Sequence, residues 1–159
     1  CKELGFNCRM TEFSAIVGLQ LLSRADEFTR RKNELVGLYK EELRGLPGLG
    51  YQRIVEDTLP TYKDFNIVVG EEFGLTRDQL ASCLEAENIE VRFYYYPPLH
   101  MQTIFRPYVS KELPVTTEIT SRVLTLPLYP DMPEHDVKRV AAVLRRIFEQ
   151  REDVAAALG

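Results

Sequence analysis

One segment near the N-terminus constrains the fold most, because its apolar side chains leave no polar face. Thr11 is a candidate N-cap for a helix over residues 12–22. Apolar or small residues occupy nearly the whole circumference of that helix: Phe13, Ala15, Ile16, Val17, Gly18, Leu19, Leu21 and Leu22. A helix that is apolar on every side has to be covered on every side. We therefore expect a partner surface on residues 12–22 and association into a homo-oligomer. The alternative is that other parts of the same domain cover this helix.

The composition favours a globular domain. The chain has 159 residues, 45% of them apolar and 28% charged, which predicts one domain, or one domain plus an arm. The formal net charge of -4 disfavours nucleic acid as a partner. No stretch approaches the roughly 18 consecutive apolar residues that a membrane span needs. We expect neither a nucleic-acid partner nor a membrane partner.

The cysteines indicate a reducing compartment. Cys1, Cys8 and Cys83 are too few and too scattered for a disulfide framework or a zinc site. We therefore expect no metal site and a cytoplasmic location. The chain begins at Cys1 and not at Met, which we interpret as processing or as a piece of a longer protein.

Residues 26–46 predict a second, amphipathic helix. Phe28, Leu35, Tyr39 and Leu43 recur near the helical period, and charged residues fill the other face. A cluster of glycine and proline then ends the helix: Gly45, Pro47, Gly48 and Gly50.

Strand patterns and helix patterns alternate in the second half. We expect strands over residues 62–69, 90–96 and 124–128. Helices are expected after a capping box formed by Thr76 and Gln79, from Pro114, and from residues 131–134.

These patterns predict an α+β fold, in which an N-terminal helical arm precedes a small three-stranded sheet with helices packed on it. The expected division is a helical arm over residues 1–46, a small α+β domain over 47–150 and a frayed tail over 151–159.

His100 is a candidate binding residue. It follows Tyr94-Tyr95-Tyr96-Pro97-Pro98-Leu99, where two prolines end a strand pattern and stiffen a loop. Rigid loops that carry aromatic side chains and one titratable group are typical of binding sites. The alternative is a loop histidine bonded to nearby backbone. His135, the only other histidine, is expected to be a solvated helix residue.

A second candidate site lies directly before the first helix. Asn7 offers amide donors and Arg9 offers a guanidinium fork, and both lie beside a helix N-terminus. That combination suits an anion, especially a phosphate. A turn role for Asn7 and a surface ion pair for Arg9 remain the alternative.

No group of residues forms a self-contained active site, so we name no catalytic residue. The six lysines all lie in polar contexts: Lys2, Lys32, Lys40, Lys63, Lys111 and Lys138. None has the apolar surroundings that would lower an amine pKa for nucleophilic chemistry. The residues by themselves favour a binding or assembly domain over a complete enzyme.

Three ordered motifs resemble one enzyme family. The Gly-Tyr-Asn-Tyr-Arg-Met-x-Glu signature of the DegT/DnrJ/EryC1/StrS aminotransferases is similar to Gly5-Phe6-Asn7-Cys8-Arg9-Met10-Thr11-Glu12. The family's Tyr-x-Pro-x-His loop resembles Tyr96-Pro97-Pro98-Leu99-His100, and its Leu-x-Leu-Pro-x-(Tyr/His)-Pro segment resembles Leu124-Thr125-Leu126-Pro127-Leu128-Tyr129-Pro130. Together the matches extend to about residue 150.

The resemblance implies the C-terminal portion of a pyridoxal-phosphate (PLP) enzyme that aminates nucleotide-linked keto-sugars. Residues 1–46 would be the end of the large domain of a fold-type I aminotransferase and the helix that links it to the small domain. Asn7 and Arg9 would reach the cofactor phosphate across a dimer interface. Tyr96 and His100 would lie at the sugar-nucleotide entrance. The Schiff-base lysine of the family would lie upstream of Cys1, so the resemblance implies PLP in the full-length enzymes but none bound to this chain alone.

Two departures leave the substrate open. Cys8 and Tyr95 stand where many family members have tyrosine and histidine. Two other interpretations also remain: a standalone non-catalytic interaction module from a truncated gene, and part of a related PLP-dependent sugar dehydratase.

Overall fold

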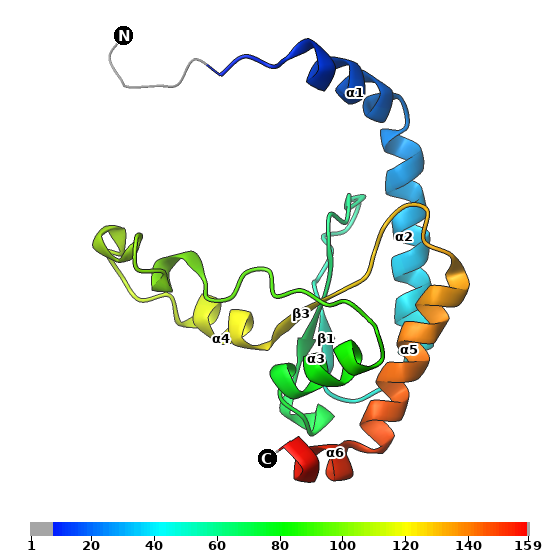
Figure 1. The fold of residues 1–159 in the computed structure, drawn as a ribbon, viewed down its shortest axis with the longest axis vertical. Coiled ribbons are helices and arrows are strands. Elements are labelled where there is room, and N and C mark those ends of the chain that lie inside the picture. The colour runs from blue at the N-terminus through cyan, green and yellow to red at the C-terminus, as the bar shows by residue number, and fades with distance from the viewer. Residues whose placement is uncertain (1–7, 159) are drawn as a thin grey trace.

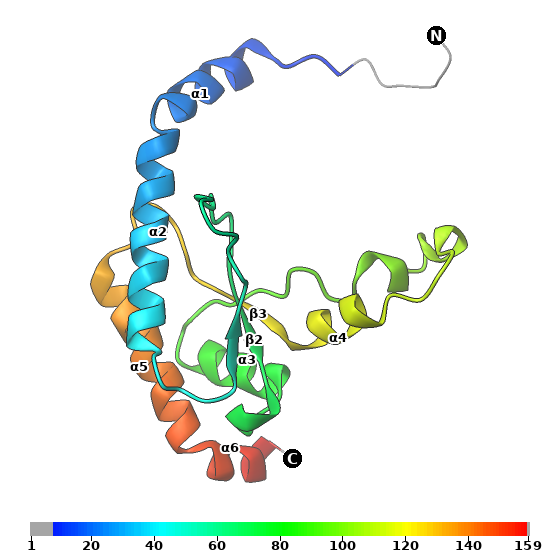
Figure 2. The same ribbon diagram turned by 180° about the vertical axis from the view of Figure 1, so that it is seen from behind.

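The chain has the shape of an open C (Figure 1). The structure, a computed structural model, describes residues 8–158. Helix α1 (Glu12–Ser23) leads into α2 (Ala25–Glu42), which runs down to a packed domain. A lobe that contains α4 (Pro114–Arg122) projects from that domain toward the same side as α1 (Figures 1 and 2).

Helix α1 confirms the helix expected over residues 12–22, and none of its residues is buried. The Thr11 Oγ1 accepts a hydrogen bond from the Ser14 backbone N–H at 3.2 Å, as expected for an N-cap. Large apolar side chains of α1 face water, with Phe13 83% and Leu22 71% exposed. The rest of the described chain therefore leaves this helix uncovered.

The core begins within α2, upstream of residue 47 where we expected the domain to start. Leu35 and Tyr39 are fully buried. The Tyr39 ring stacks on Phe65 of the sheet at a centroid distance of 5.1 Å. Helix α5 (Glu134–Glu149) packs beside α2 and turns its expected apolar stripe into the same core. The shared core fixes the direction in which α2 carries α1 away from the domain.

The sheet has three antiparallel strands in the order β1-β2-β3. They are β1 (Leu49–Tyr51), β2 (Phe65–Val69) and β3 (Val123–Leu126). Alternate residues of β2 are buried, as the period of two predicts. Three strands with packed helices confirm the α+β prediction.

The identity of one strand was predicted wrongly. Residues 90–96 form no strand, and only Arg92 pairs, in an isolated bridge with Thr125. Pro97 and Pro98 follow at once and cannot extend a ladder. The third strand is instead β1, which we had assigned to the glycine-rich end of the preceding helix. Its place is set by long-range pairing, with Leu49 opposite Val69.

Two shorter helices complete the domain. The capping box of Thr76 and Gln79 is present and begins α3 (Arg77–Ala86). Residues 151–158, which we expected to fray, form α6 (Arg151–Leu158). The Arg151 guanidinium lies 4.4 Å from the Phe148 ring centroid, and Val154 packs against the core. These contacts hold a terminal segment, which we expected to fray because chain ends are often poorly ordered.

Candidate functional site

The residues expected at the sugar entrance lie on a lobe that leaves the sheet and returns to it. We define the 94–122 lobe as the chain between the Arg92 bridge and β3. It contains an aromatic loop, two short 3₁₀ turns, η2 (Leu99–Met101) and η3 (Arg106–Tyr108), and α4. Only Pro98 is buried among these residues. The lobe is therefore fastened by a few contacts at its base and is exposed elsewhere.

His100 is held by a side chain of α4. Its Nε2 lies 3.0 Å from the Thr117 Oγ1, and that hydroxyl donates to the Leu113 carbonyl at 3.0 Å. Since the hydroxyl proton is engaged by Leu113, the His100 Nε2 is the donor in this pair. In the neutral tautomer that carries its proton on Nε2, the lone pair lies on Nδ1, which can accept a hydrogen bond. In place of the nearby backbone bond that the alternative interpretation requires, the imidazole makes a contact across 17 residues of sequence.

A groove runs beside His100. Its volume is about 790 Å³, and it is lined by η2 and by the segment that leads into α4. Its lining comprises His100, Met101, Val109, Leu113, Pro114 and Thr117 together with the polar Ser110, Lys111, Glu112 and Glu118. The groove is mostly apolar with a few polar groups, the character of small-molecule sites.

Tyr96 is held by an arginine from another element. The Arg77 guanidinium lies 4.3 Å from the Tyr96 ring centroid, and Arg77 itself is buried. The outer part of the Tyr96 side chain stays accessible, since the residue is 51% exposed. Tyr96 can therefore contact a ligand while its ring is anchored from behind.

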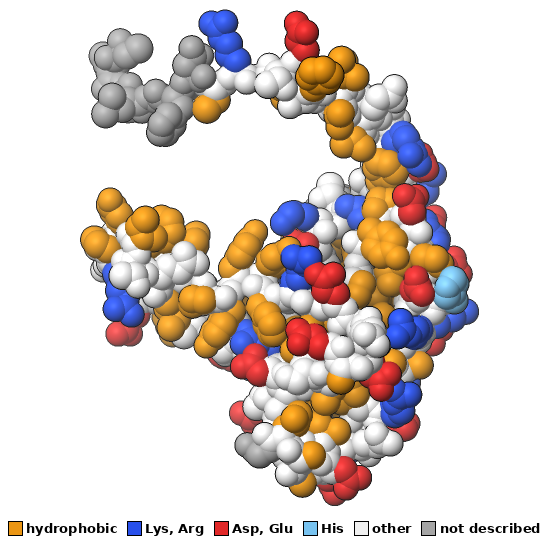
Figure 3. Space-filling model, in the orientation of Figure 1, with side chains coloured by type: hydrophobic (Ala, Val, Ile, Leu, Met, Phe, Trp, Pro, Cys, Tyr) orange, Lys and Arg blue, Asp and Glu red, His pale blue; other side chains and the backbone are white. Residues whose placement is uncertain are grey.

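Arg9 lies exposed just before α1, while Asn7 lies outside the described residues. No hydrogen bond or ion pair within residues 8–158 joins Arg9 to Tyr96 or His100. The described segment before α1, which carries Arg9, and the 94–122 lobe lie on the two limbs of the open C (Figures 1 and 3). Figure 3 shows a wide opening between these limbs, with apolar side chains along both edges.

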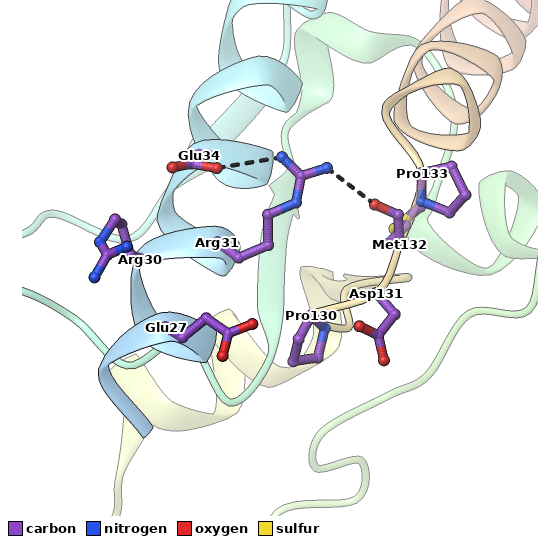
Figure 4. A pocket seen from close by; sticks show the side chains of 8 residues that line it. All are labelled: Glu27, Arg30, Arg31, Glu34, Pro130, Asp131, Met132 and Pro133. Carbon is purple, nitrogen blue, oxygen red and sulfur yellow. Dashed lines mark hydrogen bonds and ion pairs between the residues drawn. The ribbon is translucent and has the colours of Figure 1, made fainter. Parts of the chain in front are cut away.

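A second hollow, of about 450 Å³, lies between α2 and the segment before α5 (Figure 4). Three of the five charged side chains that line it form ion pairs, two of them with each other. Arg31 bonds Glu34 at 3.2 Å and donates to the Met132 carbonyl at 3.3 Å. Glu27 bonds Arg24 at 2.9 Å. We therefore place the candidate site at the lobe and not here.

The lysines in the described range do not fit a covalent bond to PLP. Such a lysine needs a sheltered amine that loses its proton readily, whereas none of Lys32, Lys40, Lys63, Lys111 and Lys138 is buried. Lys63 shows the opposite tendency. Its Nζ lies 3.3 Å from an Asp64 carboxylate oxygen, and the hydrogen bond and charge of Asp64 raise the pKa of this amine.

Two further classes of site are absent from residues 8–158. No three histidine, cysteine or acidic side chains gather closely enough there to hold a metal ion. No helix in that range has the length and apolar character needed to cross a bilayer. His135 is exposed beside Asp136, as expected for a surface helix residue.

Sequence reasoning missed Arg77 and Thr117 as partners of the candidate site. Arg77 lies between Thr76 and Gln79, the two residues of the capping box, and is the first residue of α3. A cation in the first turn of a helix meets the positive end of the helix dipole, so its presence there signals another stabilising contact. Thr117 carries no such signal, because its role depends on the way the lobe folds back.

Comparison with known proteins agrees with this fold. The family model for the DegT/DnrJ/EryC1/StrS aminotransferase family matches residues 1–145. The chain is 29% identical over 143 residues to the dTDP-4-amino-4,6-dideoxy-D-glucose transaminase of Escherichia coli, covering 88% of this chain and 38% of that protein. It is 28% identical to the GDP-perosamine synthase of Vibrio cholerae, covering 91% of this chain and 39% of that protein.

Solved structures give the same relationship. DesI, solved in the presence of its TDP-sugar product, superposes with a TM-score of 0.87 at 29% identity, over 98% of this chain and 40% of DesI. DesV from S. venezuelae superposes with a TM-score of 0.83 at 29% identity, over 93% of this chain and 39% of DesV. The chain thus spans about two fifths of the length of these relatives. The match over residues 1–145 shows that this chain belongs to the DegT/DnrJ/EryC1/StrS family of PLP-dependent aminotransferases.

Proposed function

We propose that the chain is the C-terminal portion of a PLP-dependent nucleotide-sugar aminotransferase and that it forms the sugar-nucleotide entrance. The observation that carries this proposal is the similarity to transaminases of nucleotide-linked sugars over most of this chain but only 38–39% of their length. No lysine among residues 8–158 is buried, which supports a division of labour in which the lysine that bonds the cofactor comes from a different part of the protein.

At the entrance, Tyr96 and His100 bind the sugar nucleotide. In the tautomer that donates from Nε2 to Thr117, His100 presents Nδ1 as an acceptor for a sugar hydroxyl. The exposed Tyr96 ring offers an apolar face beside a phenolic hydroxyl, which suits a sugar with both apolar and polar edges. These residues orient the substrate and perform no bond-breaking step themselves.

Arg9, together with Asn7, contacts the PLP phosphate of a second subunit. PLP, when bound, supplies the electron sink for amino transfer. A flexible cation with a forked donor group suits a phosphate. The exposure of Arg9 on the limb opposite the lobe supports a contact with another molecule.

Helix α1 associates with a second copy of the protein. Its exposed apolar residues include Phe13, Ile16, Leu19 and Leu22, and such a surface is stable in water only when covered. We place the protein in the cytoplasm, where the free thiols of Cys8 and Cys83 would stay reduced.

The test compares KM for the sugar nucleotide with KM for the amino donor in the complete gene product that contains these residues. We expect amino transfer to a nucleotide-linked keto-sugar. Tyr96→Ala and His100→Ala should raise KM for the sugar nucleotide about tenfold or more and leave KM for the amino donor unchanged. Absence of amino transfer would contradict the proposal and favour a non-catalytic module or a dehydratase. An equal rise in both KM values would contradict the entrance role.

A further inference from the structure

The Arg77 guanidinium is buried between two aromatic rings of the segment that carries the candidate site. Its central carbon lies 4.6 Å from the Phe93 ring centroid and 4.3 Å from the Tyr96 ring centroid. Arg77 is only 5% exposed. A planar guanidinium can stack on both faces at once, and this attraction strengthens when water is excluded.

The edges of the same guanidinium make polar contacts with the next residue of α3 and with α4. Its Nε donates to the Asp78 carboxylate at 2.8 Å, which neutralises the buried charge. Its Nη1 donates to the Thr120 carbonyl at 2.7 Å. Arg77 therefore joins the start of α3, the aromatic loop and α4 at a single point.

The contact with Thr120 reaches the second site residue through α4. Thr120 lies one helical turn after Thr117, and Thr117 binds the His100 imidazole at 3.0 Å. The face of the guanidinium thus fixes Tyr96, and its edge fixes the helix that holds His100.

We propose that Arg77 is a positioning residue that holds Tyr96 and His100 in one fixed arrangement for a nucleotide-linked sugar. The nature of that ligand rests on the proposed function, whereas the arrangement rests on the contacts above. A lysine at position 77 would keep the charge but lose both the stacking plane and the forked donors.

Arg122 provides a matched control. It also fastens the lobe, because its Nε donates to the Val69 carbonyl at 3.0 Å and its Nη1 bonds Glu118 at 2.9 Å. None of these contacts involves Tyr96 or His100. Arg122→Lys should therefore loosen the end of α4 and leave the aromatic sandwich intact.

The first experiment measures side-chain NMR signals in the 159-residue chain. Only eight tyrosines and two histidines need assignment. Arg77→Lys should shift the ring signals of both Tyr96 and His100. Phe93→Leu, which removes one face of the sandwich and keeps Arg77, should shift Tyr96 less. Arg122→Lys should leave Tyr96 unchanged. Unshifted Tyr96 and His100 signals in folded Arg77→Lys protein would overturn the inference.

The second experiment measures dTDP-glucose binding to the complete gene product by calorimetry. Arg77→Lys should weaken binding about tenfold, and Arg122→Lys less than twofold. Equal dTDP-glucose affinity of the wild type and Arg77→Lys would overturn the proposal that Arg77 positions side chains for ligand binding. If the wild type binds none of dTDP-glucose, UDP-glucose and GDP-mannose while the NMR shifts occur, the proposed function fails and the positioning of the two side chains stands.

Discussion

The Nε2 of His100 lies 3.0 Å from the Oγ1 of Thr117, so a residue of η2 is oriented by a residue of α4. This contact fixes which imidazole nitrogen faces outward. Thr117→Val keeps the shape of the side chain and removes the acceptor. A neutral hydrogen bond contributes about 0.5–1.5 kcal/mol, so we expect sugar-nucleotide affinity to fall roughly two- to tenfold.

The control for this prediction is Thr117→Ser, which retains the hydroxyl and should bind as the wild type does. Calorimetric titration of the complete gene product with dTDP-glucose measures the effect. Equal affinities for the valine and serine variants would show that the hydrogen bond has no part in binding.

Alkaline stability should depend on Tyr39. Burial raises the pKa of its phenol, and its hydroxyl donates to the Pro127 carbonyl at 3.0 Å. Above the ordinary tyrosine pKa of about 10, the unfolded chain loses this proton and the folded chain keeps it. The free energy of unfolding should therefore fall by up to about 1.4 kcal/mol per pH unit.

Tyr39→Phe removes that pH dependence at the cost of about 1 kcal/mol near pH 7. Urea denaturation between about pH 8 and about pH 11 compares the two proteins. Their stabilities should converge as pH rises. If the unfolding free energies of the two proteins stay parallel across this pH range, Tyr39 is excluded as the group responsible for the loss of stability.

Two glycines should respond oppositely to substitution by alanine. Gly48 has a positive φ of 74°, and a Cβ there would overlap the backbone of Phe73. Gly48→Ala should destabilise the fold by at least about 2 kcal/mol. Gly37 lies inside α2 with open space around it, so Gly37→Ala should stabilise by about 0.8–1 kcal/mol. Thermal unfolding with circular dichroism measures both, and a stabilised Gly48→Ala protein would contradict the structure of this turn.

Association through α1 should depend on its exposed apolar residues. Ile16→Lys and Leu19→Lys each place a charge in the expected dimer interface. Burial of the apolar side chain that each change removes would stabilise the dimer by about 1.5–3 kcal/mol. The dimer dissociation constant should rise at least tenfold for each change. Leu59→Lys serves as the control, because Leu59 is similarly exposed, at 68%, but lies between β1 and β2. A wild-type chain that sediments as a monomer at all concentrations would contradict this prediction.

Local sequence signals predicted the helices better than the strands. The capping box of Thr76 and Gln79 and the apolar stripe of α5 depend on neighbours within one or two turns, and both are present. Strand β1 contains only Leu49, Gly50 and Tyr51, and its pairing with β2 is a long-range event. A pattern rich in aromatic residues over 90–96 indicated a strand, but its side chains serve the Arg77 contact and the loop.

The sequence predicted which residues belong to the candidate site but not how their side chains are arranged. His100 was identified because a stiff aromatic loop is typical of binding sites, and Tyr96 because its loop resembles the family's Tyr-x-Pro-x-His motif. The contacts that orient them come from Arg77 and Thr117, which lie 19 and 17 residues away in sequence. Such pairs follow from the way the lobe returns to β3, and no local period indicates them.

The most direct test of the central claim is borohydride reduction of the chain after incubation with PLP, followed by peptide mapping. The account predicts no stoichiometric pyridoxyl group on any lysine of the 159 residues. In the complete gene product, one such group should map outside them. A single lysine of this chain that is modified stoichiometrically, with loss of the cofactor's visible absorbance on reduction, would contradict the account.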